Sequence, residues 1–294
     1  MTDQRDLRLA VLIDADNAPR NCIKAVMEEI AIYGTPTVKR IYGDWTSPNV
    51  GSWKTALLEN AITPIQQYGY TTGKNSTDSA MIIDAMDILY SGRTDGFCIV
   101  SSDSDFTRLA IRLREAGMKV IGIGEKKTPG AFIVACDKFI YIEVIRAAAA
   151  ELEKSAAKAA AKTEKQAALN KNNAKKPTAV KKKQENGNGH HAPESSAPVA
   201  APEEAHTENG AHRVPDNIVK LIAASVSDIA DEDGYAFMGE LGNLLLKKQP
   251  DFDPRNFGFT KLTPLIRSLG RFEVDVRQTA DANIKHIYLR DKQA

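Results

Sequence analysis

The first half of the chain alternates between short apolar runs and longer segments with helical periodicity. A continuous apolar run of about four to eight residues is typical of a buried strand, whereas apolar residues that recur every three or four positions indicate a helix. Strands of this kind, separated by helices, favour an α/β domain with a parallel sheet covered on both faces. The predicted strands are 7–14, 37–43, 62–67, 96–102, 119–124 and 138–143, and the predicted helices are 18–34, 52–61, 77–92, 105–117 and 129–136.

The C-terminal part of the chain, residues 214–294, has a different pattern. Three amphipathic segments come first, and two segments with alternating apolar and polar residues follow. Three helices and a β-hairpin together predict a small winged helix-turn-helix domain of the α+β class. The predicted helices are 215–230, 236–249 and 256–269, and the predicted strands are 271–277 and 283–290.

Residues 147–213, between these two parts, are rich in alanine, lysine, proline, glycine and asparagine. Such a composition cannot bury enough apolar surface to offset the entropy of the chain, so we expect a disordered linker. Its first part, 147–169, favours helix by propensity but has almost no apolar stripe, so extension of the last helix of the first domain as a solvated rod is an alternative there. The predicted domains are therefore 1–146 and 214–294. The linker carries a marked charge pattern: ten lysines and one glutamate lie in 154–183, and five glutamates with no lysine or arginine lie in 184–208.

Composition also bears on where the protein works. No window approaches 18 uncharged apolar residues, so we expect no transmembrane helix and no membrane partner. The charged N-terminal segment lacks the features of a secretory signal. Cys22, Cys98 and Cys136 are isolated and flanked by apolar residues, which indicates buried thiols in a reducing compartment. We therefore expect a cytoplasmic protein.

Aspartates follow two of the predicted strands. Asp14 ends the strand 7–14, and Asp103 and Asp105 follow the strand 96–102. Asp78 lies at the start of the helix 77–92. Because the carboxyl ends of parallel strands meet at one edge of a sheet, we expect these four carboxylates to share a crevice.

Four clustered carboxylates raise one another's pKa unless a cation compensates them. The segment 1–146 contains no histidine, and oxygen ligands alone suit Mg²⁺ or Mn²⁺. Such ions support displacement at phosphorus. The sequence therefore predicts a divalent-metal site, although Asp105 as a helix cap and Asp14 as a turn residue remain alternatives.

Four motifs in the first domain resemble the NYN family of the PIN-like nuclease superfamily: "LIDADNAP", "KRIYGDW", "STDSAMIIDAMD" and "VSSDSDF". The resemblance covers the whole first domain and implies a PIN-like fold with metal-dependent cleavage of RNA, DNA being a possible second substrate. It implies that Asp14, Asp78, Asp103 and Asp105 are the catalytic and metal-binding residues. Asn17, Ser102, Lys126 and Lys127 would then contact the substrate.

The C-terminal domain resembles the LOTUS, or OST-HTH, family, most clearly in "FDPRNFGFTKLTPLI". The resemblance implies RNA binding and, in some members, a protein partner. Arg255 and Lys261 are the candidate RNA contacts. The 11 basic and 12 acidic groups of residues 214–294 make this domain nearly neutral, so a protein partner stays open beside RNA.

Three functions compete at this point. The first is a metal-dependent ribonuclease that acts through the four aspartates and uses the C-terminal domain to bind RNA. The second is an RNA-binding or scaffold protein, with the same domains, whose catalysis is weak or absent. The third is a phosphatase of the haloacid dehalogenase type, because "VLIDADN" imitates the opening aspartate pair of that family. That family also needs a lysine motif further along the chain, and no clear one follows "VLIDADN".

Overall fold

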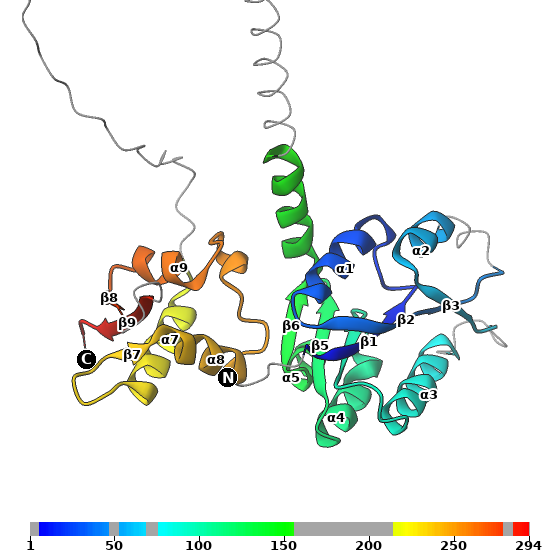
Figure 1. Cartoon of the computed structure of the whole chain (residues 1–294), viewed down its shortest axis with the longest axis horizontal. Coiled ribbons are helices and arrows are strands. Elements are labelled where there is room, and N and C mark those ends of the chain that lie inside the picture. The colour runs from blue at the N-terminus through cyan, green and yellow to red at the C-terminus, as the bar shows by residue number, and fades with distance from the viewer. Residues whose placement is uncertain (1–5, 47–52, 69–75, 156–213, 279–284, 294) are drawn as a thin grey trace, which may run out of the picture. The chain divides into compact units, whose positions relative to one another are not determined.

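Figure 1 shows a computed structural model of the chain, which describes residues 6–46, 53–68, 76–155, 214–278 and 285–293. In the first domain, strands alternate with helices as the hydrophobic pattern predicts. The strands are β1 (Arg8–Asp14), β2 (Thr35–Gly43), β3 (Thr63–Gln66), β4 (Gly96–Val100), β5 (Lys119–Gly124) and β6 (Lys138–Tyr141). The helices are η1 (Arg20–Cys22), α1 (Ile23–Ala31), α2 (Lys54–Asn60), α3 (Ser76–Tyr90), η3 (Ser104–Phe106), α4 (Thr107–Glu115) and α5 (Gly130–Ala135).

All six strands pair in parallel, in the order β3-β2-β1-β4-β5-β6. Successive side chains of a strand point to opposite faces, so Leu9, Val11 and Ile13 pack on the face of α1 and α2. Ala10 and Leu12 pack on the face of α3, α4 and α5. Figure 1 shows the helices on both sides of the sheet. The predicted parallel sheet with two covered faces is confirmed.

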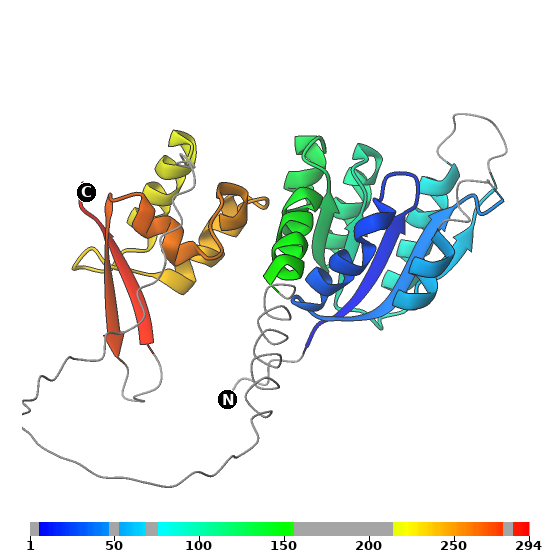
Figure 2. The ribbon, with the colours of Figure 1, turned by 90° about the horizontal axis from the view of Figure 1, so that it is seen from above.

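The C-terminal domain packs three helices against a small antiparallel sheet, which confirms the predicted α+β class. Figure 2 shows β8 and β9 running side by side. The sheet of the C-terminal domain has the order β7-β9-β8, and the core of this domain contains Ile222, Leu241, Leu265 and Leu289. The elements are α7 (Asp216–Ile229), β7 (Ala236–Phe237), α8 (Met238–Lys248), η4 (Pro254–Phe257), α9 (Leu262–Ser268), β8 (Phe272–Gln278) and β9 (Lys285–Asp291).

The third predicted helix of this domain, 256–269, is wrong in its first half. The structure has η4 there, and α9 begins only at Leu262. Gly258 adopts a positive φ of 82°, a backbone conformation that ends a helical turn and favours glycine. The predicted helix 236–249 also begins later, because Ala236 and Phe237 pair with β9.

The last strand of the first domain is shorter than predicted. It ends at Tyr141, and residues 142–155 are helical. Ile142 and Ile145 are buried against the α1 and α2 face of the sheet, so this helix begins within the fold of the first domain. The predicted disorder of the linker concerns mainly residues 156–213, which lie outside the described part of the chain. Among the described helices, none combines the length and the apolar character that crossing a membrane requires.

Candidate metal centre

The strand order has its switch point between β1 and β4. From β1 the chain continues to β2 on one side, whereas from β4 it continues to β5 on the other. Ligands bind at such a switch point, beyond the carboxyl ends of the strands. Asp14 ends β1, and Asp103 follows β4 by three residues. The sequence prediction that these ends share one edge of the sheet is therefore confirmed by the pairing of Ile13 with Val100.

Three aspartates meet beside this switch point. Asp78, Asp103 and Asp105 each offer a carboxylate oxygen, and these oxygens all lie within 4.8 Å of one another. Asp78 comes from the first turn of α3, which covers the face of the sheet that carries Ala10 and Leu12. Asp78 and Asp103 are half-buried, and Asp105 is exposed. A group of oxygen ligands at this spacing, open on one side, suits a hard divalent cation that keeps some of its water.

Asp14, the fourth predicted ligand, lies beside this group but differs from it in environment. Its side chain is buried, with the residue 1% exposed. Its Oδ1 accepts the Asp16 amide at 3.0 Å. Its Oδ2 accepts Nδ2 of Asn17 at 2.7 Å and Oγ of Ser101 at 2.8 Å. These three hydrogen bonds fix the orientation of the Asp14 carboxylate beside the three ligands.

The crowding of these carboxylates is visible in Asp78. Burial, together with the negative charges of Asp14, Asp103 and Asp105, raises the pKa of Asp78 to about 6. Because a bound divalent cation would reverse the sign of the local potential, it would favour the ionised form. The aspartate group is therefore electrostatically strained when no cation compensates it.

Replacement of Asp78 by asparagine should stabilise the metal-free protein at neutral pH. A carboxyl whose pKa is raised on folding destabilises the fold as the pH rises from about 4 through about 6, because the folded state resists ionisation. The site is partly open to solvent, so we expect a gain of only about 1 kcal/mol. That gain corresponds to about 2–4 °C in Tm. Thermal unfolding in EDTA at pH 7.5 and pH 4.5 tests this.

The matched control for this experiment is Asp87→Asn, which removes a carboxylate from an exposed position later in α3. The Asp78 variant should gain stability at pH 7.5 and lose that gain at pH 4.5, and the Asp87 variant should show no such difference. If both variants change Tm equally at both pH values, repulsion among the clustered carboxylates does not destabilise the protein.

Ser101, which sequence analysis missed, joins the two halves of the site. Its hydroxyl donates to Asp14 Oδ2 at 2.8 Å and accepts the Asp103 amide at 3.0 Å. The predicted residue, Ser102, instead accepts the Glu125 amide at 2.9 Å. Strand alternation explains the difference. Phe97 and Ile99 face α3, so position 101 does too, whereas position 102 shares the opposite face with Cys98 and Val100.

Replacement of Ser101 by alanine should weaken metal binding by about 10–100-fold, the range found when groups that orient metal ligands are removed. The substitution takes one donor from Asp14 and the acceptor from the Asp103 amide. Mn²⁺ titration by calorimetry measures the effect. Ser102→Ala is the matched control, because it removes a comparable bond to Glu125 on the other face. Equal losses in the two variants would argue for a general loss of stability.

The alternative roles considered for the aspartates can now be assigned. Asp103, and not Asp105, is the cap: its Oδ1 accepts the Asp105 amide at 2.9 Å at the start of η3. Asp84, a further aspartate of α3, is not part of the carboxylate group and pairs with Arg40 and the Tyr42 hydroxyl. Asn17 uses its amide group to hold Asp14, so it orients the site in addition to any contact with substrate.

The four predicted cationic contacts fall in different surroundings. The side chain of Lys126 is exposed, and Lys127 pairs with Glu125 at 2.7 Å on the surface. Lys261 is exposed at the start of α9. Arg255 differs from all three, because its guanidinium group is already paired with two carboxylates, Glu29 and Asp253. Lys261 is therefore the more open of the two candidate RNA contacts in the C-terminal domain.

Comparison with known proteins finds two domain families in this chain. Residues 8–143 match the NYN domain, and residues 213–283 match the OST-HTH/LOTUS domain. No curated protein matches the sequence.

Two solved structures are similar to parts of the chain. One is a protein of unknown function from Vibrio parahaemolyticus, with 20% identity, a TM-score of 0.40 and coverage of 48% of this chain and 96% of that one. The other is an uncharacterised protein from Nitrosomonas europaea, with 30% identity, a TM-score of 0.26 and coverage of 33% of this chain and 92% of that one.

Proposed function

We propose that this chain, which carries an NYN domain followed by an OST-HTH/LOTUS domain, is a metal-dependent ribonuclease. The NYN domain belongs to a superfamily of nucleases, and the OST-HTH/LOTUS domain agrees with an RNA-related role. The observation that carries the proposal is the group of three carboxylate oxygens within 4.8 Å at the switch point of the sheet.

The donor set fits Mg²⁺ or Mn²⁺, since the three carboxylates supply hard oxygen ligands and the domain contains no histidine. Such an ion, when bound, supplies charge neutralisation at a phosphodiester and lowers the pKa of a water molecule. The chain's own contribution is positional. Asp78, Asp103 and Asp105 would hold the ion, while Ser101 and Asn17 fix the orientation of the neighbouring Asp14 carboxylate.

The exposed Lys126 and Lys261, with the lysines of segment 154–183, are the groups we propose to meet RNA phosphates. The attraction of lysines for phosphates is independent of sequence and falls with salt. The protein would therefore select its substrate through the fold of the C-terminal domain and hold it through the lysines.

Cleavage of labelled RNA and DNA in Mn²⁺, Mg²⁺ and EDTA is the direct test. We expect RNA cleavage with either ion and none in EDTA. Undiminished cleavage in EDTA, once metal removal is verified, would overturn the metal mechanism. Faster cleavage of DNA than of RNA would show that DNA is the preferred substrate.

The second function, an RNA-binding scaffold without useful catalysis, uses the same domains. A Mn²⁺ binding isotherm combined with RNA binding and no turnover would favour it. The phosphatase hypothesis needs Asp14 to attack phosphorus, yet the residue is 1% exposed and both of its oxygens accept hydrogen bonds. Its geometry fits a supporting charge and not a nucleophile.

A further inference from the structure

The edge strand of the parallel sheet, β6, contacts the C-terminal domain. Within the described sheet, β6 is the last strand and pairs only with β5. Edge strands present unpaired amide and carbonyl groups that invite another segment to bind. Here the Phe139 amide donates to the carbonyl oxygen of Pro250 at 2.9 Å. Tyr141, two residues along the same strand, donates its hydroxyl to Asp251 at 2.7 Å.

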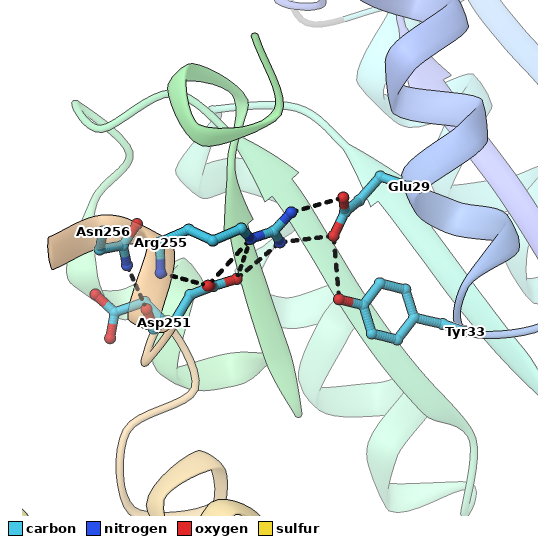
Figure 3. A network of polar contacts seen from close by, with 6 residues as sticks. Glu29, Tyr33, Asp251, Arg255 and Asn256 are labelled. Atoms are coloured by element: carbon cyan, nitrogen blue, oxygen red, sulfur yellow. Dashed lines mark hydrogen bonds and ion pairs between the residues drawn. The ribbon is translucent and has the colours of Figure 1, made fainter. Parts of the chain in front are cut away.

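A network of charged and polar side chains also joins the two domains, and Figure 3 shows Arg255, Glu29 and Tyr33 within it. Arg255 donates from Nη1 and Nη2 to the two carboxylate oxygens of Glu29, at 2.9 and 2.7 Å. The same guanidinium group contacts Asp253, with Nη2 at 2.8 Å from Oδ2. Tyr33 of the first domain donates its hydroxyl to Glu29 Oε1 at 3.1 Å. The two-pronged geometry is the strong and directional form of an arginine-carboxylate pair.

The two carboxylates of the network are buried, Arg255 is half-buried, and the charges nearly balance. Glu29 is 7% exposed and Asp253 is 8% exposed. Two carboxylates face Arg255, and Lys138 of β6 lies close enough to interact electrostatically with all three groups. Buried charges persist when each has a partner, and removal of one partner leaves the others uncompensated. Arg255 is the member that joins residues 226 positions apart in the sequence.

We infer that the C-terminal domain docks in cis on the first domain, with segment 250–255 seated against α1 and the β6 edge and with Arg255 as the central anchor. The partner of this surface is therefore the chain's own C-terminal domain. Residues up to Glu151 and from Arg213 onward form one compact unit, which agrees with docking. The docked domains would therefore move together.

Amide exchange at Phe139 in the full-length protein tests the docking, because this amide donates across the interface. We expect slow exchange in the unaltered protein. Arg255→Ala should accelerate it about 100-fold, since the loss removes the cation that pairs directly with Glu29 and Asp253. Glu29→Gln, which keeps an acceptor for Tyr33, should also accelerate exchange. The double variant should show much less than the product of the two effects, as expected for paired groups.

Arg271→Ala is the matched control, because this arginine makes a comparable two-pronged contact with Asp291 inside the C-terminal domain, from Nε to Oδ1 and from Nη2 to Oδ2. It should leave exchange at Phe139 unchanged. Unchanged exchange in Arg255→Ala, with α7 and α8 still protected, would overturn the docking. Sedimentation of the unaltered protein as a dimer, with Phe139 protected only in that dimer, would overturn its cis character. No RNA or metal enters these measurements, so their outcome is independent of the proposed nuclease activity.

Discussion

Replacement of Asp103 by asparagine is expected to abolish RNA cleavage while the protein stays folded. Asp103 supplies one of the three oxygens of the candidate metal centre. Its Oδ1 also accepts the Asp105 amide as a cap, and an asparagine side chain can still accept that bond. The substitution therefore removes the charge and keeps the local hydrogen bond. A metal ion contributes several kcal/mol to transition-state stabilisation, so we expect a loss of about 10³-fold or more in kcat.

Two measurements make this prediction specific. Single-turnover cleavage gives the rate, and Mn²⁺ titration shows whether the ion is still bound. Asp103→Ala should lose the cap as well as the charge, so it should be less stable than the asparagine variant. Each 1 kcal/mol of stability lost with the cap should lower Tm by about 2–4 °C. Asp87→Asn should cleave at the normal rate. Full activity in Asp103→Asn would remove this residue from the site.

Replacement of segment 154–183 by an uncharged glycine-serine segment of equal length should cause the largest loss of RNA affinity. The segment carries ten lysines and one glutamate. In the C-terminal domain, by contrast, many cations are already neutralised: Lys248, Arg255, Arg271, Arg277 and Arg290 all pair with aspartate or glutamate. Each lysine that meets a phosphate releases bound counterions, so its loss lowers affinity and flattens the salt dependence.

RNA binding measured between about 50 and 200 mM salt tests this. If about five lysines meet phosphates, the slope of log affinity against log salt should shrink by about 3.5 for a single strand. Affinity at the lower salt should fall about 100-fold or more. The matched control is the same exchange within 184–208, which carries five glutamates and no lysine or arginine. A salt slope that is unchanged by the loss of the lysines would place the phosphate contacts in the folded domains.

The carboxylate site could be located from the sequence because it depends on topology. The ends of two parallel strands and the start of one helix place Asp14, Asp103 and Asp78 near one another regardless of detail. Strand alternation also contained the information that places Ser101 on the face of Asp14, although the prediction named only Ser102. The break at Gly258 was likewise visible as a glycine within a predicted helix.

Other features depend on contacts that no local pattern contains. Asp14 differs from the other aspartates because Ser101, 87 positions away, donates to it. Arg255 has the sequence surroundings of an exposed RNA contact, and its partner Glu29 lies 226 positions earlier. The same arginine therefore fits two roles from the sequence alone, and only the tertiary structure shows which carboxylates it meets.

The cover on the β6 edge has a practical consequence for experiments on shortened chains. A fragment that ends near residue 143 would keep the NYN domain but remove the Pro250 carbonyl that the Phe139 amide contacts. A bare edge of this kind recruits the same edge of a neighbouring molecule. Such a fragment should self-associate as its concentration rises. If RNA cleavage by the fragment is weak, the cause would then be aggregation of the protein and not a weak catalytic site.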